Sequence, residues 1–503
     1  MGFSDRRAPV LIGVGEASGK SLGLEWPSPV DLAAGAVKAA LADSSANGTD
    51  RLADSIDCLL ATRLFYDSGV AHQYGSPANL PDAIARASGL NPAQLIYGDV
   101  GGHSPQKYVN ELAVQLYEGK VKAAILCGSE AVGTVKRAKK AGHKMDWSQP
   151  SDRDFTDKRS NFAVLSMYEI RHGIISMPMA YGLLENARRR RLDMDRDSYA
   201  ADMAELWSAF SSVASSREHA QFAKHWSKEE LLISDDGNYR LNDPYRRWMV
   251  AQDAVTLGGA VIMTTAGHAA DLGISKDRMI YLHSGADSSA PIISEQMELS
   301  HSPAIKWAVT QALNLAEREA GDIGPIDIYS CFPVAVSLAI EALNQPDRPL
   351  SSYTLTGGLS FFGGPGNNYS THAIIALVQA LRKDGSKPGM ISANGGVINK
   401  ESVGIYAAQP VTGGWSPDRI ATPNILPPDK GTKPAHFASG NGVINSYALP
   451  YVKDLPGPAT VWMTDENGIP CLGLLENAPT DADLIGATVT ISSDGKRNHA
   501  VLK

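Results

Sequence analysis

The sequence predicts an α/β protein whose core consists of two similar halves, followed by a small all-β unit. Three observations support this prediction: a helix-strand pattern that occurs twice, a long polar excursion that interrupts the first copy, and a change of composition after Gln409. The length of 503 residues fits, because a chain this long divides into two or three domains.

Each copy of the pattern begins with a Ser-Pro pair. Ser28-Pro29 opens an Ala-rich stretch to about Ala42, and Ser302-Pro303 opens a matching one to about Ala320. Ser suits the N-cap of a helix and Pro its first position. Each helix leads to a short apolar run that begins Ile-Asp, at 56–60 and 326–331, which is typical of a buried strand. We therefore expect residues 28–62 and 302–331 to superpose.

A second unit is also present in both halves. Ser104-Pro105 starts a helix with apolar residues at one face of a 3.6-residue period, followed by a strand at 123–127. In the later copy the apolar face runs from Ile374 to Leu381, and the strand at 390–393 precedes Asn394-Gly395-Gly396. Two copies indicate two similar layers about a pseudo-twofold axis. Coincidental likeness between α/β segments is the weaker explanation.

The remaining segments differ in character. The excursion at 136–243 is polar and helix-rich and contains the run Arg188–Arg191. An insertion this long usually serves binding. For any single arginine, a position on a solvated helix face is the simpler interpretation. Prolines dominate 409–436, which indicates a linker. Five short strand-like runs then suggest a barrel of the OB type. The predicted units are 1–135 with 244–285, 136–243, 286–408, 409–436 and 437–503.

Charge and cysteine content exclude several classes of protein. The 46 basic and 54 acidic residues give a net charge of −8, which argues against a protein that coats nucleic acid. Four cysteines without CxxC spacing make neither a disulfide scaffold nor a metal finger, and we expect no metal or resident cofactor. No apolar run approaches ~18 residues, and no secretory or peroxisomal signal is recognisable. We expect a cytoplasmic protein.

Several motifs resemble the thiolase superfamily over about residues 8–408. They are the repeated β/α units, the insertion, the run Val-Thr-Leu-Gly-Gly-Ala at 255–260, His283-Ser284 and the Cys331-Phe332 pair. The pair is similar to thiolases related to sterol carrier protein 2, and the extra C-terminal domain resembles the mycobacterial group called thiolase-like protein type 1. The resemblance implies a duplicated thiolase fold with two βαβαβαββ halves in a layered α/β/α/β/α core, each half a mostly parallel five-stranded sheet, with a helical loop insertion and a C-terminal OB-like domain.

The chemistry of that family needs a nucleophilic cysteine at a helix N-terminus, where the helix dipole favours thiolate. Here the matching position holds His103, followed by Ser104. Histidine can act as a nucleophile or a base, but it cannot form the thioester of this mechanism. His103 is therefore a catalytic residue of that altered kind or a polar residue that caps a helix or pocket. We expect the helix dipole to lower its pKa.

The other family positions are partly kept. Cys331 stands where the related thiolases place their acid/base cysteine, with a buried structural cysteine as the alternative. The family's Gly-His-Pro is Gly363-Gly364-Pro365, so an imidazole of the oxyanion hole is missing. The late Cys-x-Gly is Ala393-Asn394-Gly395, and Asn394 offers a hydrogen-bond donor instead. We expect His103, Cys331, Gly364 and Asn394 to line one pocket.

The resemblance implies coenzyme A (CoA) or acyl-CoA as ligand, as for acetyl-CoA acetyltransferase, with substrate contacts from Ser104, Gly364, Pro365, Arg189 and Arg190. Two functions stay open: an acyltransferase with an altered catalytic set, or a non-catalytic acyl-CoA-binding protein of lipid metabolism. A nucleic-acid role for the barrel ranks below both. The family's dimer strand matches 95–102, where glycines and a charge at Asp99 weaken strand pairing, so we favour a monomer.

Overall fold

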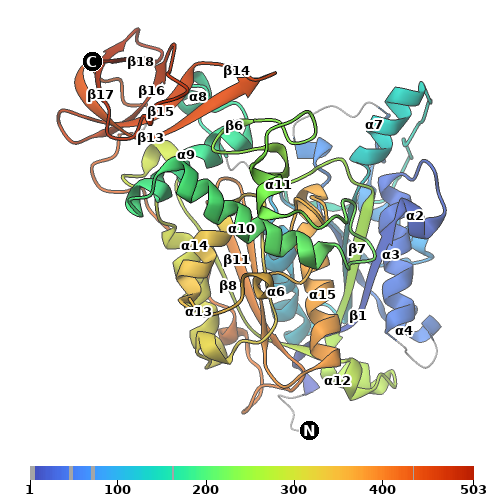
Figure 1. The fold of residues 1–503 in the computed structure, drawn as a ribbon. Helices are drawn as coiled ribbons and strands as arrows, with labels where there is room; N and C mark the ends of the chain where they lie inside the picture. The colour runs from blue at the N-terminus through green and yellow to red at the C-terminus, as the bar shows by residue number, and fades with distance from the viewer. Residues whose placement is uncertain (1–5, 45–48, 69–73, 161–163, 434) are drawn as a thin grey trace.

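The structure is a computed structural model that describes all residues except 1–5, 45–48, 69–73, 161–163 and 434. It contains an 11-stranded sheet in the core and a seven-stranded sheet formed near the C-terminus. Figure 1 shows the C-terminal sheet at one end of the molecule, beside helices of the insertion.

The first half of the core contains five strands in the order β3-β2-β4-β7-β1. β2 runs parallel to β3 and β4, whereas β7 is antiparallel to both β4 and β1. The strands are β1 (Pro9–Ser18), β2 (Cys58–Ala61), β3 (Gln94–Tyr97), β4 (Ala123–Glu130) and β7 (Leu257–Thr265). The helices are α2 (Gly19–Leu22), α3 (Pro29–Asp43), α4 (Thr49–Ser55), α5 (Leu80–Ser88), α6 (Ser104–Tyr117), α7 (Val132–Ala141) and α12 (Ala266–Asp271).

The second half contains four core strands in the order β8-β11-β10-β9. They are β8 (Ile280–Ser289), β9 (Ile326–Ile328), β10 (Gly389–Gly395) and β11 (Lys400–Ala407), with the short β12 (Asn424–Ile425) beside β8. The helices are α13 (Pro303–Ala316), α14 (Pro333–Leu343) and α15 (Tyr369–Lys383).

The duplication predicted from the Ser-Pro pairs is confirmed. Ser28 and Ser302 are both N-caps, and their hydroxyls accept hydrogen bonds from Asp31 N at 3.1 Å and Ile305 N at 3.2 Å. The order β1-α3-β2-α5-β3-α6-β4-β7 recurs as β8-α13-β9-α14-α15-β10-β11. The halves join where β1 pairs antiparallel with β8.

The expectation of two mostly parallel five-stranded sheets is corrected by this topology. Between α14 and α15, where every residue is described, no strand forms; the chain makes turns and short 3-10 segments. The Gly-rich sequence at 357–366 explains this, because glycine loses entropy in a strand and packs no side chain. β10 and β11 are joined by a tight hairpin, which requires antiparallel pairing.

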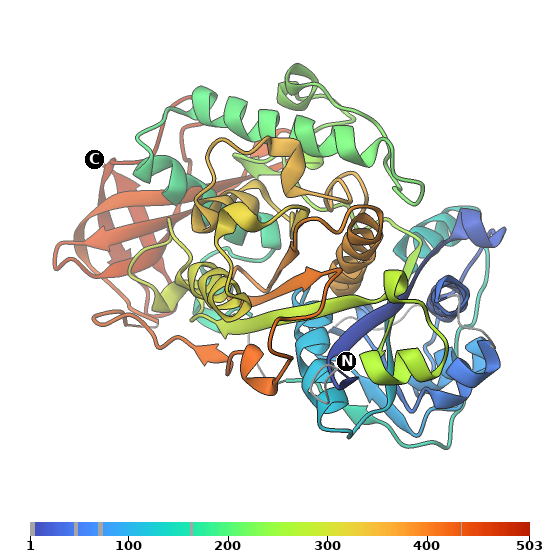
Figure 2. The ribbon, with the colours of Figure 1, turned by 90° about the horizontal axis from the view of Figure 1, so that it is seen from below.

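The core is layered as the resemblance implies. Helices α6 and α15 contact each other and strands of both halves, so they form the central layer. α3 packs on β1, β4 and β7 with α5 beside it, and α13 packs on β8 and β11 with α14 beside it. Figure 2 shows the sheet between these helical groups.

The insertion connects the core to the C-terminal domain. It contains β5 (Thr156–Asp157), α8 (Met167–Arg171), α9 (Met177–Arg191), α10 (Arg196–Ala214), α11 (Lys228–Leu232) and β6 (Asn242–Asp243). β5 adds a parallel strand to the outer edge of β3, and β6 pairs with the first strand of the C-terminal sheet. α9 packs between that strand and α14.

The C-terminal strands form a closed ring in the order β13-β15-β16-β18-β17, with β17 returning to β13. They are β13 (Gly440–Val452), β15 (Ala459–Asp465), β16 (Pro470–Leu475), β17 (Thr488–Ser493) and β18 (Asn498–Leu502), with β14 (Leu455–Pro456) at the end of β13. The barrel has its own apolar core, which includes Ile444, Val461 and Val489. The prediction of five strands in a barrel-like domain is confirmed.

Within the described part of the chain, no helix is long and apolar enough to cross a membrane. The same residues contain no group of three or more metal-binding side chains.

Candidate functional site

Two of the four residues expected in one pocket, Cys331 and Asn394, are in contact. The side-chain nitrogen of Asn394 lies 3.6 Å from the sulfur of Cys331. A Cβ placed on Gly395 would lie 2.5 Å from Nδ1 of His103, so the imidazole faces the residue after Asn394 in β10. Neighbouring residues of a strand point to opposite faces, so a single pocket for His103, Cys331, Gly364 and Asn394 stays a prediction.

His103 occupies the N-cap of α6, yet its side chain makes no capping hydrogen bond. The residue is 5% exposed, and its Nδ1 is buried and has no hydrogen-bond partner among the described residues. Burial lowers its pKa to about 3, and the charges of Lys400 and Lys107 act in the same direction against the opposing effect of Asp99. The direction is the one predicted from sequence, but the main cause is burial. His103 is a neutral imidazole at pH 7.

Cys331 lies two residues before α14 and is 8% exposed. Burial raises the pKa of its thiol to about 12, although a hydrogen bond with Tyr181 lowers it in part. The sulfur is therefore a thiol at neutral pH, which suits proton donation and does not suit nucleophilic attack.

Tyr181 of α9 is a residue that the sequence analysis missed. Its hydroxyl accepts from Asn394 Nδ2 at 3.0 Å and donates to the carbonyl of Gly396 at 3.0 Å. Its ring stacks on Phe332 with centroids 4.1 Å apart. The insertion thus places a phenol over the Cys331 loop. An aromatic residue in an amphipathic helix carries no local signal of such a role.

Glu401 and Tyr329 were missed as well. Glu401 pairs with Asn394 across the hairpin and is 1% exposed, and in the described part of the chain its Oε1 has no hydrogen-bond partner. Burial raises its pKa well above the usual range, and its charge would raise that of Cys331. The Tyr329 hydroxyl lies against Gly102, where a Cβ would approach it to 2.2 Å. For Glu401, its position within a predominantly apolar strand was a sequence signal that could have marked it as a candidate site residue.

Gly364 lies behind the Cys331 loop. Its N–H donates to the carbonyl of Gln252 at 2.8 Å, and Ala251 N donates to the carbonyl of Cys331 at 3.0 Å. Pro365 precedes a 3-10 turn whose Asn367 accepts from Gly101 N at 2.8 Å. The Asn367 side chain therefore holds the backbone of the segment before His103.

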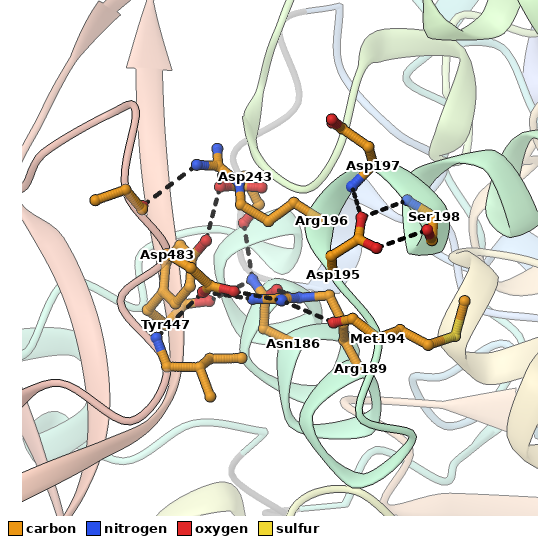
Figure 3. A network of polar contacts seen from close by, with 12 residues as sticks. Asn186, Arg189, Met194, Asp195, Arg196, Asp197, Ser198, Asp243, Tyr447 and Asp483 are labelled. Atoms are coloured by element: carbon orange, nitrogen blue, oxygen red, sulfur yellow. Dashed lines mark hydrogen bonds and ion pairs between the residues drawn. The ribbon is translucent and has the colours of Figure 1, made fainter.

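The positions expected to contact substrate lie in different environments. Ser104 is completely buried, and its hydroxyl has no partner among the residues that the structure describes. Arg189 is 3% exposed and pairs with Asp483 of the C-terminal domain through contacts of 2.6 and 2.8 Å, as Figure 3 shows. Arg190 is exposed and lines a surface cavity of about 360 Å³ with Arg191 and His301.

The duplicated, five-layered core with a site at the start of α6 defines a thiolase-like protein. No protein-family model and no curated protein matches the chain. A crystal structure of a monomeric SCP2-thiolase like protein type 1 from Mycobacterium smegmatis is 32% identical, with a TM-score of 0.80, and the match covers 99% of this chain and 100% of that one. The chain belongs to this family of the thiolase superfamily.

Two other solved structures share the fold. Acat5 thiolase from Ascaris suum, solved in complex with coenzyme A, is 15% identical with a TM-score of 0.56. Acetyl-CoA acetyltransferase from Syntrophomonas wolfei is 14% identical, also with a TM-score of 0.56. Each match covers 80% of this chain and 99% of the other.

Proposed function

We propose that the protein binds CoA or an acyl-CoA thioester and does not form a cysteinyl thioester at the start of α6. The observation that carries the proposal is His103, a neutral, buried imidazole at the N-cap where the family's nucleophile belongs. The fold relationship supports the ligand class, since the Acat5 thiolase was solved in complex with coenzyme A.

The chemistry around His103 fits recognition of a polarised carbonyl better than nucleophilic attack. His103, Tyr329 and the Asn394 amide are uncharged hydrogen-bonding groups at neutral pH, whereas the one proton of the Tyr181 hydroxyl is already donated to Gly396. Preorganised neutral donors of this kind stabilise negative charge on a carbonyl oxygen. A thioester carbonyl is such a group, and binding it needs no thiolate.

Isothermal titration calorimetry with CoA and acetyl-CoA tests binding. We expect saturable heats with the wild-type chain, weakened by His103→Ala. Cys471→Ala serves as a matched control, because Cys471 is buried in the C-terminal barrel and remote from the site. An absence of heat up to millimolar concentrations of both ligands overturns the proposal.

Acyl transfer is a second candidate, favoured by one observation. Asn394 Nδ2 lies within reach of both the Tyr181 hydroxyl and Cys331 Sγ, so three proton-bearing groups are already in contact. Turnover of acetoacetyl-CoA with CoA should then fall in Cys331→Ala and stay unchanged in Cys471→Ala. Mass spectrometry after incubation with acyl-CoA would detect an adduct on Cys331 or His103. No turnover with short, medium or long chains rejects this candidate.

We also propose that the chain is a cytoplasmic monomer of lipid metabolism with an OB-like C-terminal barrel. Numbered along the chain from β13 as strand 1 to β18 as strand 5, without the short β14, the barrel strands pair in the order 1-2-3-5-4, and strand 4 closes onto strand 1. This order supports an OB-like barrel. The outer edge of β3 is paired with β5 of the same chain, which supports the monomer.

A further inference from the structure

A small cavity of about 110 Å³ lies between the insertion and the C-terminal domain, away from Cys331. It is bounded by the start of α10, the turn around β6, and the end of β13. The residues that line it are Arg196, Asp197, Ala200, Arg240, Asn242, Asp243, Pro244, Tyr245, Arg246 and Tyr451. Three arginines and two aspartates face a volume that would hold one small ion.

The two aspartates do not neutralise the three arginines. Asp243 pairs with Arg196 at 2.7 Å and accepts from the Tyr447 hydroxyl at 2.9 Å, as Figure 3 shows. Asp197 lies on the exposed rim at the start of α10. Neither carboxylate makes an ion pair with Arg240 or Arg246 in the described part of the chain. One positive charge therefore remains unbalanced in the cavity.

Arg240 and Arg246 are held side by side. Their backbones pair in an isolated antiparallel β-bridge, so their side chains lie next to each other on the same face. The Arg240 guanidinium lies 5.2 Å from the centre of the Tyr451 ring. Arg240 is exposed and Arg246 is half-buried. Their like charges repel, and an anion bound between the two guanidinium groups would relieve that repulsion.

Several polar groups at the cavity also lack hydrogen-bond partners among the described residues. Among the described residues, Arg246 Nε and the Tyr451 hydroxyl are buried donors without a partner, and Tyr451 is only 9% exposed. The side-chain oxygen of Asn242, which is 2% exposed, is a buried acceptor that also has no partner in the described part of the chain. Burial and the charge of Arg240 lower the pKa of Arg246. Buried donors normally find acceptors, so these groups indicate a ligand.

We propose that this cavity binds a phosphoryl group through Arg240, Arg246 and the Tyr451 hydroxyl. Phosphate oxygens accept from guanidinium forks, and the one O–H of hydrogen phosphate would donate to Asn242. The volume admits the group itself and no attached base or chain, which would extend into solvent. The source is free phosphate or a terminal phosphate of CoA. The site does not depend on the proposed function, because inorganic phosphate alone should occupy it.

Calorimetric titration with inorganic phosphate at constant ionic strength tests the site. We expect the dissociation constant to rise at least about 10-fold in Arg246→Gln, since the variant removes one partner of a buried charged contact. Tyr451→Phe removes a single oxygen and keeps the ring, so it should weaken phosphate several-fold without affecting folding. Arg137→Gln is the matched control, an exposed arginine of α7 outside the cavity, and should bind as the wild type does. Absent binding, or equal binding by Arg246→Gln and Arg137→Gln, overturns the proposal.

Comparing the binding of CoA with that of dephospho-CoA, which lacks the 3′-phosphate, shows whether the phosphoryl group in the cavity belongs to CoA or is free phosphate. If CoA supplies the group, phosphate competes with CoA, and Arg246→Gln weakens CoA but not dephospho-CoA. If the ion is free phosphate, it binds alongside CoA, and the variant changes phosphate binding alone. Failure of CoA to bind at all, with phosphate binding kept, would reject the proposed function and leave this site intact.

Discussion

The side-chain amide of Asn394 donates a hydrogen bond of 3.0 Å to the hydroxyl of Tyr181, joining the β10–β11 hairpin to α9 of the insertion. The same hydroxyl donates to the carbonyl of Gly396, so the hairpin holds the phenol on both sides. Stacked on Phe332, the ring covers the loop that carries Cys331. An element outside the duplicated core thus decides how accessible Cys331 is.

Removal of the Tyr181 ring should make Cys331 reactive. In the folded wild-type protein we expect iodoacetamide to modify Cys331 at pH 7.5 at least about 100-fold more slowly than in the unfolded chain, because burial raises the pKa of the thiol to about 12. Tyr181→Ala should increase the rate about 10-fold by admitting water and reagent. Peptide mass mapping gives the rate at each cysteine. Cys471 is the internal control, and equal acceleration at both cysteines would mean general loosening of the fold.

The imidazole of His103 should stay neutral far below pH 6. Because its pKa is lowered to about 3 in the folded protein, its contribution to stability is present above the unfolded value near 6.5 and is lost as pH falls through about 3. NMR of labelled histidine, with His103→Gln to assign the resonance, measures this pKa. Titration at or above the value of a model imidazole contradicts the burial described for this ring.

Glu130 should make the protein less stable at alkaline pH. It is 2% exposed at the end of β4, and burial raises its pKa to about 8, with Asp67 and Asp253 acting in the same direction. The folded state then keeps a proton that the unfolded chain releases near pH 4.5, so stability is greatest below that pH and declines as pH rises through about 8.

The Glu130→Gln variant isolates this effect. It keeps the shape and cannot ionise, so the difference in unfolding free energy between variant and wild type should grow in the variant's favour between pH 5 and 8.5, by a few kcal/mol in order of magnitude. Urea denaturation at three pH values measures it, and the contributions of other groups cancel in the difference. A difference that does not change with pH would show that Glu130 is ionised in the folded state.

Loss of Asp483 should destabilise the junction between the insertion and the barrel. Arg189 is 3% exposed, so Asp483→Ala leaves a buried guanidinium without its carboxylate. Because Asp483 itself is 38% exposed, the expected cost is about 2 kcal/mol rather than the larger value of a fully buried pair. Thermal denaturation checks this, with Asp481→Ala, an exposed aspartate two residues earlier, as control. Equal melting temperatures for the two variants would refute the assignment.

Sedimentation equilibrium at micromolar concentration should give a mass near 53.5 kDa. The reason is that β5 already occupies the outer edge of β3, through the pairs Ile96 with Thr156 and Tyr97 with Asp157. A second chain cannot use those backbone groups while β5 is in place. A mass of twice this value would show that a dimer forms without this edge or displaces β5.

The fold was largely predictable because its signals are local. The Ser-Pro pairs at 28–29 and 302–303 mark helix starts, and Asn467-Gly468 marks a turn between barrel strands, each through short-range backbone chemistry. The missing strand between α14 and α15 was not predicted, because the duplication itself suggested a complete second half.

The sequence by itself determined the duplicated core and the barrel-like C-terminal domain, and it predicted His103 at the position of the family nucleophile. Only the tertiary structure decided that Tyr181 covers Cys331, that Arg189 pairs with Asp483, and that β5 occupies the edge of β3. The physical reason is separation along the chain. Helix caps, turns and apolar periods depend on neighbours within a few residues, whereas Arg189 and Asp483 are 294 positions apart and Tyr181 and Asn394 are 213 apart. Such contacts depend on how the elements pack, and no local pattern encodes them.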